Sequence, residues 1–311
     1  MDSYDFLVTE EEEGIRLDRL LAELCPDQSR SYLQKLLKEG AVTVNQEPSP
    51  PKPSYRVHEN DHIHLTVPDQ VLPIAVPQNI PLDILYEDKD VLVVNKPKHM
   101  VVHPAPGHPD GTLVNAVLYH CHGTLSGING VLRPGIVHRI DQDTTGSVIV
   151  CKNDAAHRSI SEQLREHTIV RRYQAICYGV IPEDSLTIQG NIGRDPGDRK
   201  RMAVVQPPAG KPAVTHVKIL ERFHGYSYVE CRLETGRTHQ IRVHMAHIGH
   251  PLLGDVTYAG GRKCPFSGLQ GQCLHAGTLG FIQPSTGEYI ETTAPLPDYF
   301  TALLDKLRSQ S

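Results

Sequence analysis

Segments with the pattern of β-strands outnumber helical segments in this chain, and several of them are separated by turns of only a few residues. The strand-like segments of the larger, C-terminal part are VLVVN, GIVHRI, SVIVCK, RRYQAICYG, VTHVKILER and YSYVECRLE. Helical patterns fit DAAHRSISEQLREH, THQIRVHMAHIG and PDYFTALLDKLRS. Short turns join antiparallel neighbours, so we expect an α+β fold built on a mostly antiparallel mixed sheet with flanking helices.

One of these junctions carries an unusual set of polar residues. In RPGIVHRIDQDTTGSVIVCKN, residues 133–153, two expected strands flank the turn DQDTTG. The junction contains His138, Arg139, Asp141 and Asp143. A carboxylate close to a core is costly unless a charged group or hydrogen bonds satisfy it. The junction is therefore either an ordinary solvated loop or a place where an aspartate is held for chemistry.

Two metal-dependent patterns share part of this turn. An EF-hand calcium loop begins DxDxxG but needs a carboxylate at its twelfth position, which is Lys152 here, and a strand replaces its second helix. Calcium is excluded. The order DxDxT also resembles the aspartyl-phosphate site of haloacid-dehalogenase-type (HAD) phosphatases. His138 and Arg139 interrupt the apolar strand that this site requires, and no paired aspartates follow it, so a phosphatase is a minor alternative.

Composition indicates where in the cell the protein is expected and whether it is expected to bind a metal. No apolar run approaches the ~20 residues that cross a bilayer, and the acidic start MDSYDFLVTEEEEG is unlike a secretion signal. Seven cysteines without close CxxC pairs indicate reduced thiols, so we expect a cytoplasmic protein without structural zinc. The histidines of HQIRVHMAHIGH do not predict a metal site, because only His244 and His247 share a helical face if Thr238 caps the helix.

The net charge of −5 is a misleading average. Residues 1–13 hold six of the 36 carboxylates and no lysine or arginine, which leaves 31 basic and 30 acidic residues in the remainder. Residues 131–245 contain 17 Lys or Arg against 12 Asp or Glu. Because the local sign matters more than the total, a phosphate-binding face is compatible with this chain.

The chain divides into two domains. Leu17, Leu20, Leu21 and Leu24 have helical spacing, and SRSYLQKLLKEG, AVTVN and DHIHLTV add a second helix and two strands. This small α/β unit resembles the S4 RNA-binding domain, which implies RNA contacts from Arg30, Lys35 and Lys38 on the second helix. We assign residues 1–13 to an acidic tail, 14–66 to the S4-like domain, 67–81 to a proline-rich linker and 82–311 to the catalytic domain.

The turn of the larger domain resembles the central motif of the RluA family of pseudouridine synthases. That motif is a strand, His-Arg-Leu-Asp, a polar turn with Thr-Ser-Gly and a second strand, and HRIDQDTTG departs from it only by Ile140 and Thr145. Further agreeing blocks are EDKDVLVVNKP, HPAPGHPDGTLVNA, RRYQAICYG, GRDPGDRKRMAV, ETGRTHQIRVHMAHIGHPLLGD and LHAGTLGFIQP. With an S4-like unit in front, the chain is most similar to the RluD-type branch, which modifies large-subunit (23S) ribosomal RNA.

The resemblance implies a reaction that breaks the base–sugar C–N bond of uridine, turns the uracil and rejoins it through carbon. No atom is gained or lost, so no nucleotide or redox cofactor is expected, and the chain has neither a P-loop nor GxGxxG. The resemblance makes Asp141 the essential carboxylate. It attacks the sugar, attacks the base or removes a sugar proton, and each of these roles requires the ionised form.

The resemblance also implies partners for Asp141. It assigns Arg242, in HQIR, as the ion-pair partner, with Arg237 as the nearest rival and as an RNA contact. Tyr173, in RRYQA, corresponds to the tyrosine that stacks on the target base. Arg139 corresponds to the arginine that fills the space left by the flipped base, where its flat guanidinium can stack and bind phosphate.

The remaining polar residues have more ordinary interpretations. We expect His138 to hold the turn by hydrogen bonds, and Asp143 to bond the backbone two residues on. The segment GRDPGDRKRMAV is either a basic loop for RNA phosphates or a solvated charge run. Its basic residues are Arg194, Arg199, Lys200 and Arg201.

Together these features predict a cofactor-independent RNA pseudouridine synthase that acts as a monomer on ribosomal RNA, free or within a precursor of the ribosomal subunit. The alternative from another functional class is an RNA-binding protein whose larger domain is inactive. The presence of Asp141, Tyr173 and Arg242 counts against that alternative.

Overall fold

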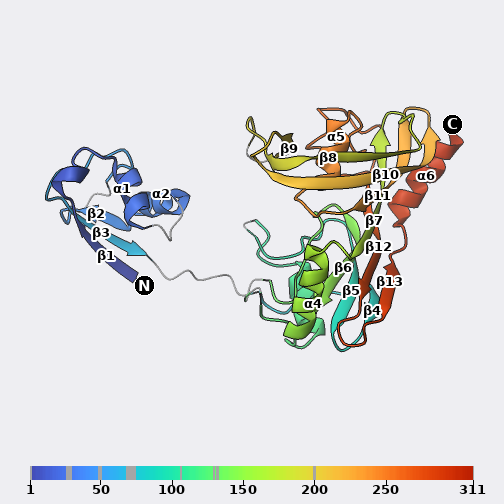
Figure 1. Ribbon diagram of the computed structural model, residues 1–311, viewed down its shortest axis with the longest axis horizontal. Helices are drawn as coiled ribbons and strands as arrows, with labels where there is room; N and C mark the ends of the chain where they lie inside the picture. Colours follow the sequence, from blue (N-terminus) through green and yellow to red (C-terminus); the bar gives the residue numbers. More distant parts are fainter. Residues whose placement is uncertain are drawn as a thin grey trace. The chain divides into compact units, whose positions relative to one another are not determined.

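A computed structural model of the protein describes residues 2–25, 30–47, 51–67, 75–105, 107–128, 130, 133–198 and 201–310. The chain forms two compact units, Met1–Leu72 and Pro73–Ser311, each of which has its own core (Figure 1). Most of the expected linker, residues 68–74, lies outside the described residues. No helix in the described ranges is long and apolar enough to span a membrane.

The first unit packs two helices on a small antiparallel sheet. Its elements are β1 (Asp2–Leu7), a 3-10 helix (Glu10–Glu12), α1 (Leu17–Leu24), α2 (Arg30–Lys38), β2 (Val42–Val44) and β3 (His62–Val67). The strand order is β1-β3-β2. Leucines of both helices, among them Leu17, Leu21, Leu33 and Leu37, pack on the inner face of the sheet, which explains their helical spacing.

The expected acidic tail at residues 1–13 is wrong, because most of it belongs to this unit. Strand β1 pairs with β3 from Asp2 opposite Val67 to Leu7 opposite His62, and Val8 is buried in the core. The carboxylate of Asp5 lies 2.8 Å from Nδ1 of His64, its cross-strand neighbour. Tyr4, Phe6 and Val8 stand at alternate positions, as in a strand, but the acidic run at residues 10–13 makes the whole segment resemble a charged tail.

The second unit is built on one ten-stranded sheet of order β4-β5-β6-β12-β7-β11-β10-β8-β9, with β13 paired to β12 (Figure 1). Among the described strands only β6 and β12 pair in parallel, so the expected mostly antiparallel mixed sheet is confirmed. The strands are β4 (Ile84–Glu87), β5 (Val91–Lys96), β6 (Thr145–Cys151), β7 (Val170–Tyr178), β8 (Ser185–Arg194), β9 (Met202–Val205), β10 (Lys211–Phe223), β11 (Tyr226–Leu233), β12 (Leu274–Ile282) and β13 (Tyr289–Thr293). The helices are α3 (Leu113–His120), α4 (Asp154–Arg165), α5 (Gln240–His247) and α6 (Asp298–Ser309).

Helices on both faces of the sheet explain why the second half of β6, residues 148–151, is apolar on both sides. Val148 and Val150 pack in the same cluster as α3, whereas Ile149 and Cys151 pack in the cluster of α4. Successive strand residues point to opposite faces, so a strand covered on both sides has no solvent face. Strand β6 is accordingly buried along its whole length, and it leads directly out of the polar turn.

The expected strand GIVHRI is wrong, and the pairing of β6 explains the difference. One edge of β6 pairs with β5, and the other pairs with β12 only at Thr145 and Gly146. The segment 135–138 follows the rest of that second edge in an irregular conformation, with one isolated bridge from Ile136 to Val150. The ring of His138 accepts the N–H of Ile149 at 3.0 Å, where a strand would offer a backbone carbonyl.

Candidate active site

The end of the irregular segment opens into a pocket of about 570 Å³. Five parts of the chain line it: residues 137–144, residues 161–167 at and after the end of α4, β7, the segment from the end of β11 into α5, and Leu274 at the start of β12. Asp141, Tyr173 and Arg242, which are far apart in the sequence, therefore lie around one cavity, and so do Arg139 and Arg237.

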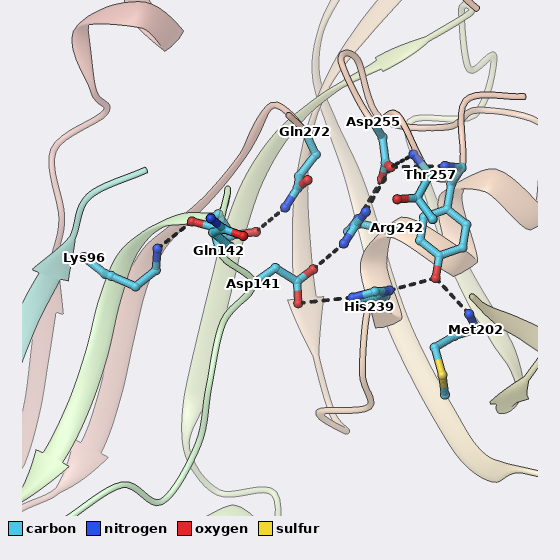
Figure 2. Close-up of polar contacts among 11 residues, drawn as sticks. Lys96, Asp141, Gln142, Met202, His239, Arg242, Asp255, Thr257 and Gln272 are labelled. Atoms are coloured by element: carbon cyan, nitrogen blue, oxygen red, sulfur yellow. Dashed lines mark hydrogen bonds and ion pairs between the residues drawn. The ribbon is translucent and has the colours of Figure 1, made fainter. Parts of the chain in front are cut away.

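Asp141 is held by an ion pair at the border of this pocket. Its carboxylate is 17% exposed, and Oδ2 accepts a hydrogen bond from Nη1 of Arg242 at 2.8 Å (Figure 2). Arg242 lies in the first turns of α5, and its side chain is only 7% exposed. The side chain of Arg237, the rival for this role, donates from Nε to the carbonyl of Pro212 at 3.0 Å.

A second carboxylate, Asp255, fixes the other edge of the Arg242 guanidinium. Nε and Nη2 of Arg242 donate to the two oxygens of Asp255 at 2.7 and 3.0 Å (Figure 2). Oδ1 of Asp255 also accepts the backbone N–H groups of Thr257 and Tyr258. Burial opposes the charge of Arg242, but Asp255 and Asp141 together raise the pKa of the guanidinium above its usual value. The guanidinium is therefore a fixed cation.

Sequence reasoning missed Asp255, Lys96 and His239 as parts of this site. Asp255 lies in the quoted block HPLLGD, where a Gly-Asp turn is the only local signal. Lys96 follows the strand VLVVN and is fully buried. The sequence offers His239 only as a possible metal ligand, yet its Nε2 lies 3.8 Å from Oδ1 of Asp141.

Lys96 holds the turn in place through hydrogen bonds to backbone carbonyls. Its Nζ donates to the carbonyls of Pro97, Met100 and Gln142 at 2.7, 2.8 and 2.9 Å. Burial lowers the pKa of Lys96 to about 7, but three carbonyl acceptors favour the ammonium form. On the other side of the turn, Nε2 of Gln272 donates to the hydroxyl of Thr144 at 3.1 Å (Figure 2).

His239 is the N-cap of α5 and has a left-handed backbone conformation, with φ of 56°, so Thr238 does not cap this helix. Its Nδ1 lies 2.8 Å from the hydroxyl of Tyr258, which accepts the N–H of Met202 (Figure 2). Burial lowers the pKa of His239, which favours a neutral ring beside the charged pair. Among the described residues, no group of three or more His, Cys, Asp or Glu is placed to hold a metal ion.

His138 holds the turn by a hydrogen bond, as expected, whereas Asp143 has a different partner from the one expected. Oδ1 of Asp143 lies 2.8 Å from Nδ1 of His99, which is half exposed, in place of the expected backbone bond two residues on. Burial, and then the charge of Arg171, lower the pKa of His138 to about 3. The neutral ring is required because its Nε2 accepts the N–H of Ile149.

This pKa predicts loss of stability in acid. An unfolded histidine binds its proton near pH 6.5, whereas folded His138 resists protonation down to about pH 3. Its stabilising contribution is therefore complete above pH 6.5 and is lost as the pH falls from 6.5 towards 3. The unfolding free energy of the wild type should fall between pH 7.5 and pH 4.5. In His138→Gln we expect this fall to be smaller by roughly 2–3 kcal/mol, measured by urea unfolding at the two pH values. Identical pH dependences in the two proteins would contradict this role.

The other expected RNA contacts are not all in the pocket. Arg139 is exposed at its border, and Arg201 places its guanidinium over the ring of Tyr258, 5.3 Å from the centroid. Lys35 and Lys38 are exposed on α2 of the first unit, where Lys35 lies 3.7 Å from Glu39. Arg199, Lys200 and the side chain of Arg30 lie outside the described residues. Arg194 ends β8 and Met202 begins β9, so the expected basic loop is the tip of a hairpin.

Comparisons with known proteins match both units of the chain. Residues 90–247 match the family described as RNA pseudouridylate synthase, and residues 15–63 match the S4 domain. The chain is 50% identical over 308 residues to "Uncharacterized RNA pseudouridine synthase YlyB" of Bacillus subtilis (strain 168), covering 99% of each chain. It is 45% identical over 312 residues to "Ribosomal large subunit pseudouridine synthase D" of Zymomonas mobilis, covering 99% of this chain and 98% of the other. The structure of "Human RNA Pseudouridylate Synthase Domain Containing 1" superposes with a TM-score of 0.57 and 27% identity, covering 75% of this chain and 96% of that one.

Proposed function

This chain belongs to the RNA pseudouridylate synthase family, and from that premise we propose that it isomerises uridines of large-subunit ribosomal RNA at Asp141. The observation that carries the assignment of the site is the 2.8 Å ion pair between Asp141 and Arg242 at the border of the pocket. The choice of RNA is supported by relatives named for the large ribosomal subunit that match nearly the whole chain.

The pocket provides the groups that the reaction needs. Asp141 supplies an ionised carboxylate, which Arg242 holds in one orientation. Tyr173 is buried and lines the same cavity, where its ring offers a stacking surface to the base. The target uridine must leave its helix to reach this cavity, at a cost of a few kcal/mol. We assign Arg139, exposed at the border of the pocket, to the space that the uridine leaves.

We further propose that the chain acts as a monomer in the cytoplasm and without a nucleotide or redox cofactor. Uridine and pseudouridine are isomers with the same number of electrons, so the reaction consumes no second substrate. The HAD-type phosphatase reading is not favoured, because the family match covers the turn that suggested it. The reading as an inactive RNA-binding protein is not favoured either, because Asp141, Tyr173 and Arg242 line one pocket.

The first unit is assigned to added RNA affinity, carried by the exposed face of α2. We expect the double variant Lys35→Gln/Lys38→Gln to reduce the slope of log affinity against log salt by about 1.5, because each lost phosphate contact removes 0.7–0.9. Filter binding to a large-subunit ribosomal RNA transcript measures this slope. The ion pair of Lys35 is exposed, so the fold is expected to be unaffected. A slope equal to that of the wild type would contradict the assignment.

Pseudouridine mapping tests the substrate. We expect large-subunit ribosomal RNA from cells that lack the gene to lose pseudouridine at a small number of positions. The wild-type gene is expected to restore those positions, and a gene that carries Asp141→Asn is not. Identical maps with and without the gene would contradict the choice of substrate. Purified protein and ribosomal RNA transcripts would then show whether the activity itself is present.

A further inference from the structure

Arg171 is a buried guanidinium in the active-site pocket that has no carboxylate partner among the described residues. It lies on β7 two positions before Tyr173, so both side chains point to the same face of the sheet, and both line the pocket. The residue is 6% exposed. Among the described residues its one hydrogen bond runs from Nη2 to the carbonyl of Glu234 at 3.3 Å, and its Nε has no partner there.

Such a group is costly to the free protein. Burial lowers the pKa of Arg171, and the nearby Arg237 adds like-charge repulsion, but a guanidinium stays protonated in proteins. A buried charge without a counter-ion destabilises the fold unless a ligand supplies the opposite charge. Arg242, in contrast, has two carboxylates.

The backbone at Gly236 lies directly against this guanidinium. Gly236, in the loop after β11, lies against Nη1 of Arg171, and a Cβ at that position would be 2.6 Å from this atom. Any side chain there would displace the guanidinium from its place. The glycine therefore leaves room for the guanidinium at the wall of the pocket.

The charge of the pocket indicates what the ligand is. Its lining includes five arginines and one carboxylate, Asp141. Arg242 neutralises Asp141, and Arg165 at the outer end pairs with the exposed Glu162. Arg139, Arg171 and Arg237 remain without a carboxylate among the residues that the structure describes. An excess of guanidinium groups with free N–H donors suits a phosphodiester, which accepts two hydrogen bonds from such a group.

We propose that Arg171 forms a phosphate subsite, which binds a backbone phosphate of the RNA beside the flipped uridine. This inference rests on the proposed RNA-modifying function and adds a ligand contact that neither the sequence pattern nor the ion pair of Asp141 assigns. Arg171 is a binding residue in this account and takes no part in the bond changes.

The test compares Arg171→Met with Arg172→Met in the full chain. Arg172 is the next residue on β7, but its side chain is 41% exposed on the opposite face, 3.9 Å from Glu291. Both variants lose one positive charge. For a large-subunit ribosomal RNA transcript we expect Arg171→Met to lower affinity about tenfold and to reduce the salt slope by about 0.7–0.9, and Arg172→Met to change neither.

Thermal unfolding separates a ligand-binding role from a structural one. Because Arg171 is a buried charge without a counter-ion, Arg171→Met is expected to raise the Tm of the free protein while it weakens RNA binding. A lower Tm, or a variant that does not fold, would overturn the proposal in favour of a structural role. Weaker binding with an unchanged salt slope would also overturn it, because the contact would then be to a neutral acceptor such as a uracil carbonyl.

These outcomes differ from a failure of the proposed function. If the wild-type protein converts uridine but Arg171→Met and Arg172→Met give equal salt slopes, only the phosphate subsite is wrong. If the wild-type protein neither binds nor converts the transcript, the choice of RNA is wrong and the subsite falls with it.

Discussion

Asp141→Asn is expected to lower the rate of pseudouridine formation at least about 10³-fold while RNA affinity stays close to that of the wild type. The amide has nearly the shape of the carboxylate but no charge, so it can neither attack carbon nor take a proton. The donor at Nη1 of Arg242, 2.8 Å from Oδ2, keeps an acceptor in the amide oxygen. Single-turnover conversion of a ribosomal RNA transcript, together with filter binding, measures both quantities.

Asp143→Asn is the matched control. Asp143 lies in the same turn, two residues further on, but its carboxylate pairs with the half-exposed His99 outside the pocket lining. We expect this variant to retain most of the activity. Wild-type rates for Asp141→Asn, or equal losses in the two variants, would contradict the assignment of Asp141 as the reactive carboxylate.

Arg242→Met is expected to reduce both stability and activity. The substitution leaves two carboxylates near each other without their shared cation, and Asp255 is fully buried. Removal of one member of a buried ion pair typically costs about 3–5 kcal/mol, so a loss of this size in unfolding free energy is expected. Conversion of uridine is expected to fall as well, because nothing then holds the carboxylate of Asp141 in place. Urea unfolding and single-turnover conversion measure the two effects.

The double variant Arg242→Met/Asp255→Asn separates these two effects. Replacing the buried carboxylate by an amide removes the uncompensated charge, so the double variant should be more stable than Arg242→Met alone. Activity should stay as low as in Arg242→Met, because Asp141 still lacks its partner. If the two substitutions destabilise additively, the two residues do not act as one charge network, and the account of the site is wrong.

Local sequence patterns predicted those helices and strands that bury a regular face. The leucine spacing of α1 and the apolar run of β6 follow directly from their packing. The GIVHRI segment has the same apolar character, yet it does not form a strand. A strand at GIVHRI would need a free edge of β6, but β5 pairs with one edge and β12 begins to pair with the other. Which strands become neighbours depends on the tertiary structure, so the local sequence does not show it.

The resemblance of HRIDQDTTG and HQIR to family motifs predicts that Asp141 and Arg242 form an ion pair, and the structure has this pair. It gave no role to Asp255, which accepts hydrogen bonds from Arg242, or to Lys96, which donates a hydrogen bond to the carbonyl of Gln142 next to Asp141. Lys96 lies 45 positions before Asp141 in the sequence, and only the pairing of β5 with β6 brings its ammonium beneath the turn. Contacts of this kind have no periodic signature, because side chains from separate strands and loops make them.

The most direct measurement of the central claim is a crystal structure of the Asp141→Asn protein bound to an RNA that contains its target uridine. We expect the uridine outside its helix and in the pocket, with its base against the ring of Tyr173. The amide of residue 141 should lie within about 3.5 Å of the ribose or the base, oriented by Arg242. A target uridine that remains stacked in its helix, or that binds away from this pocket, would contradict the account.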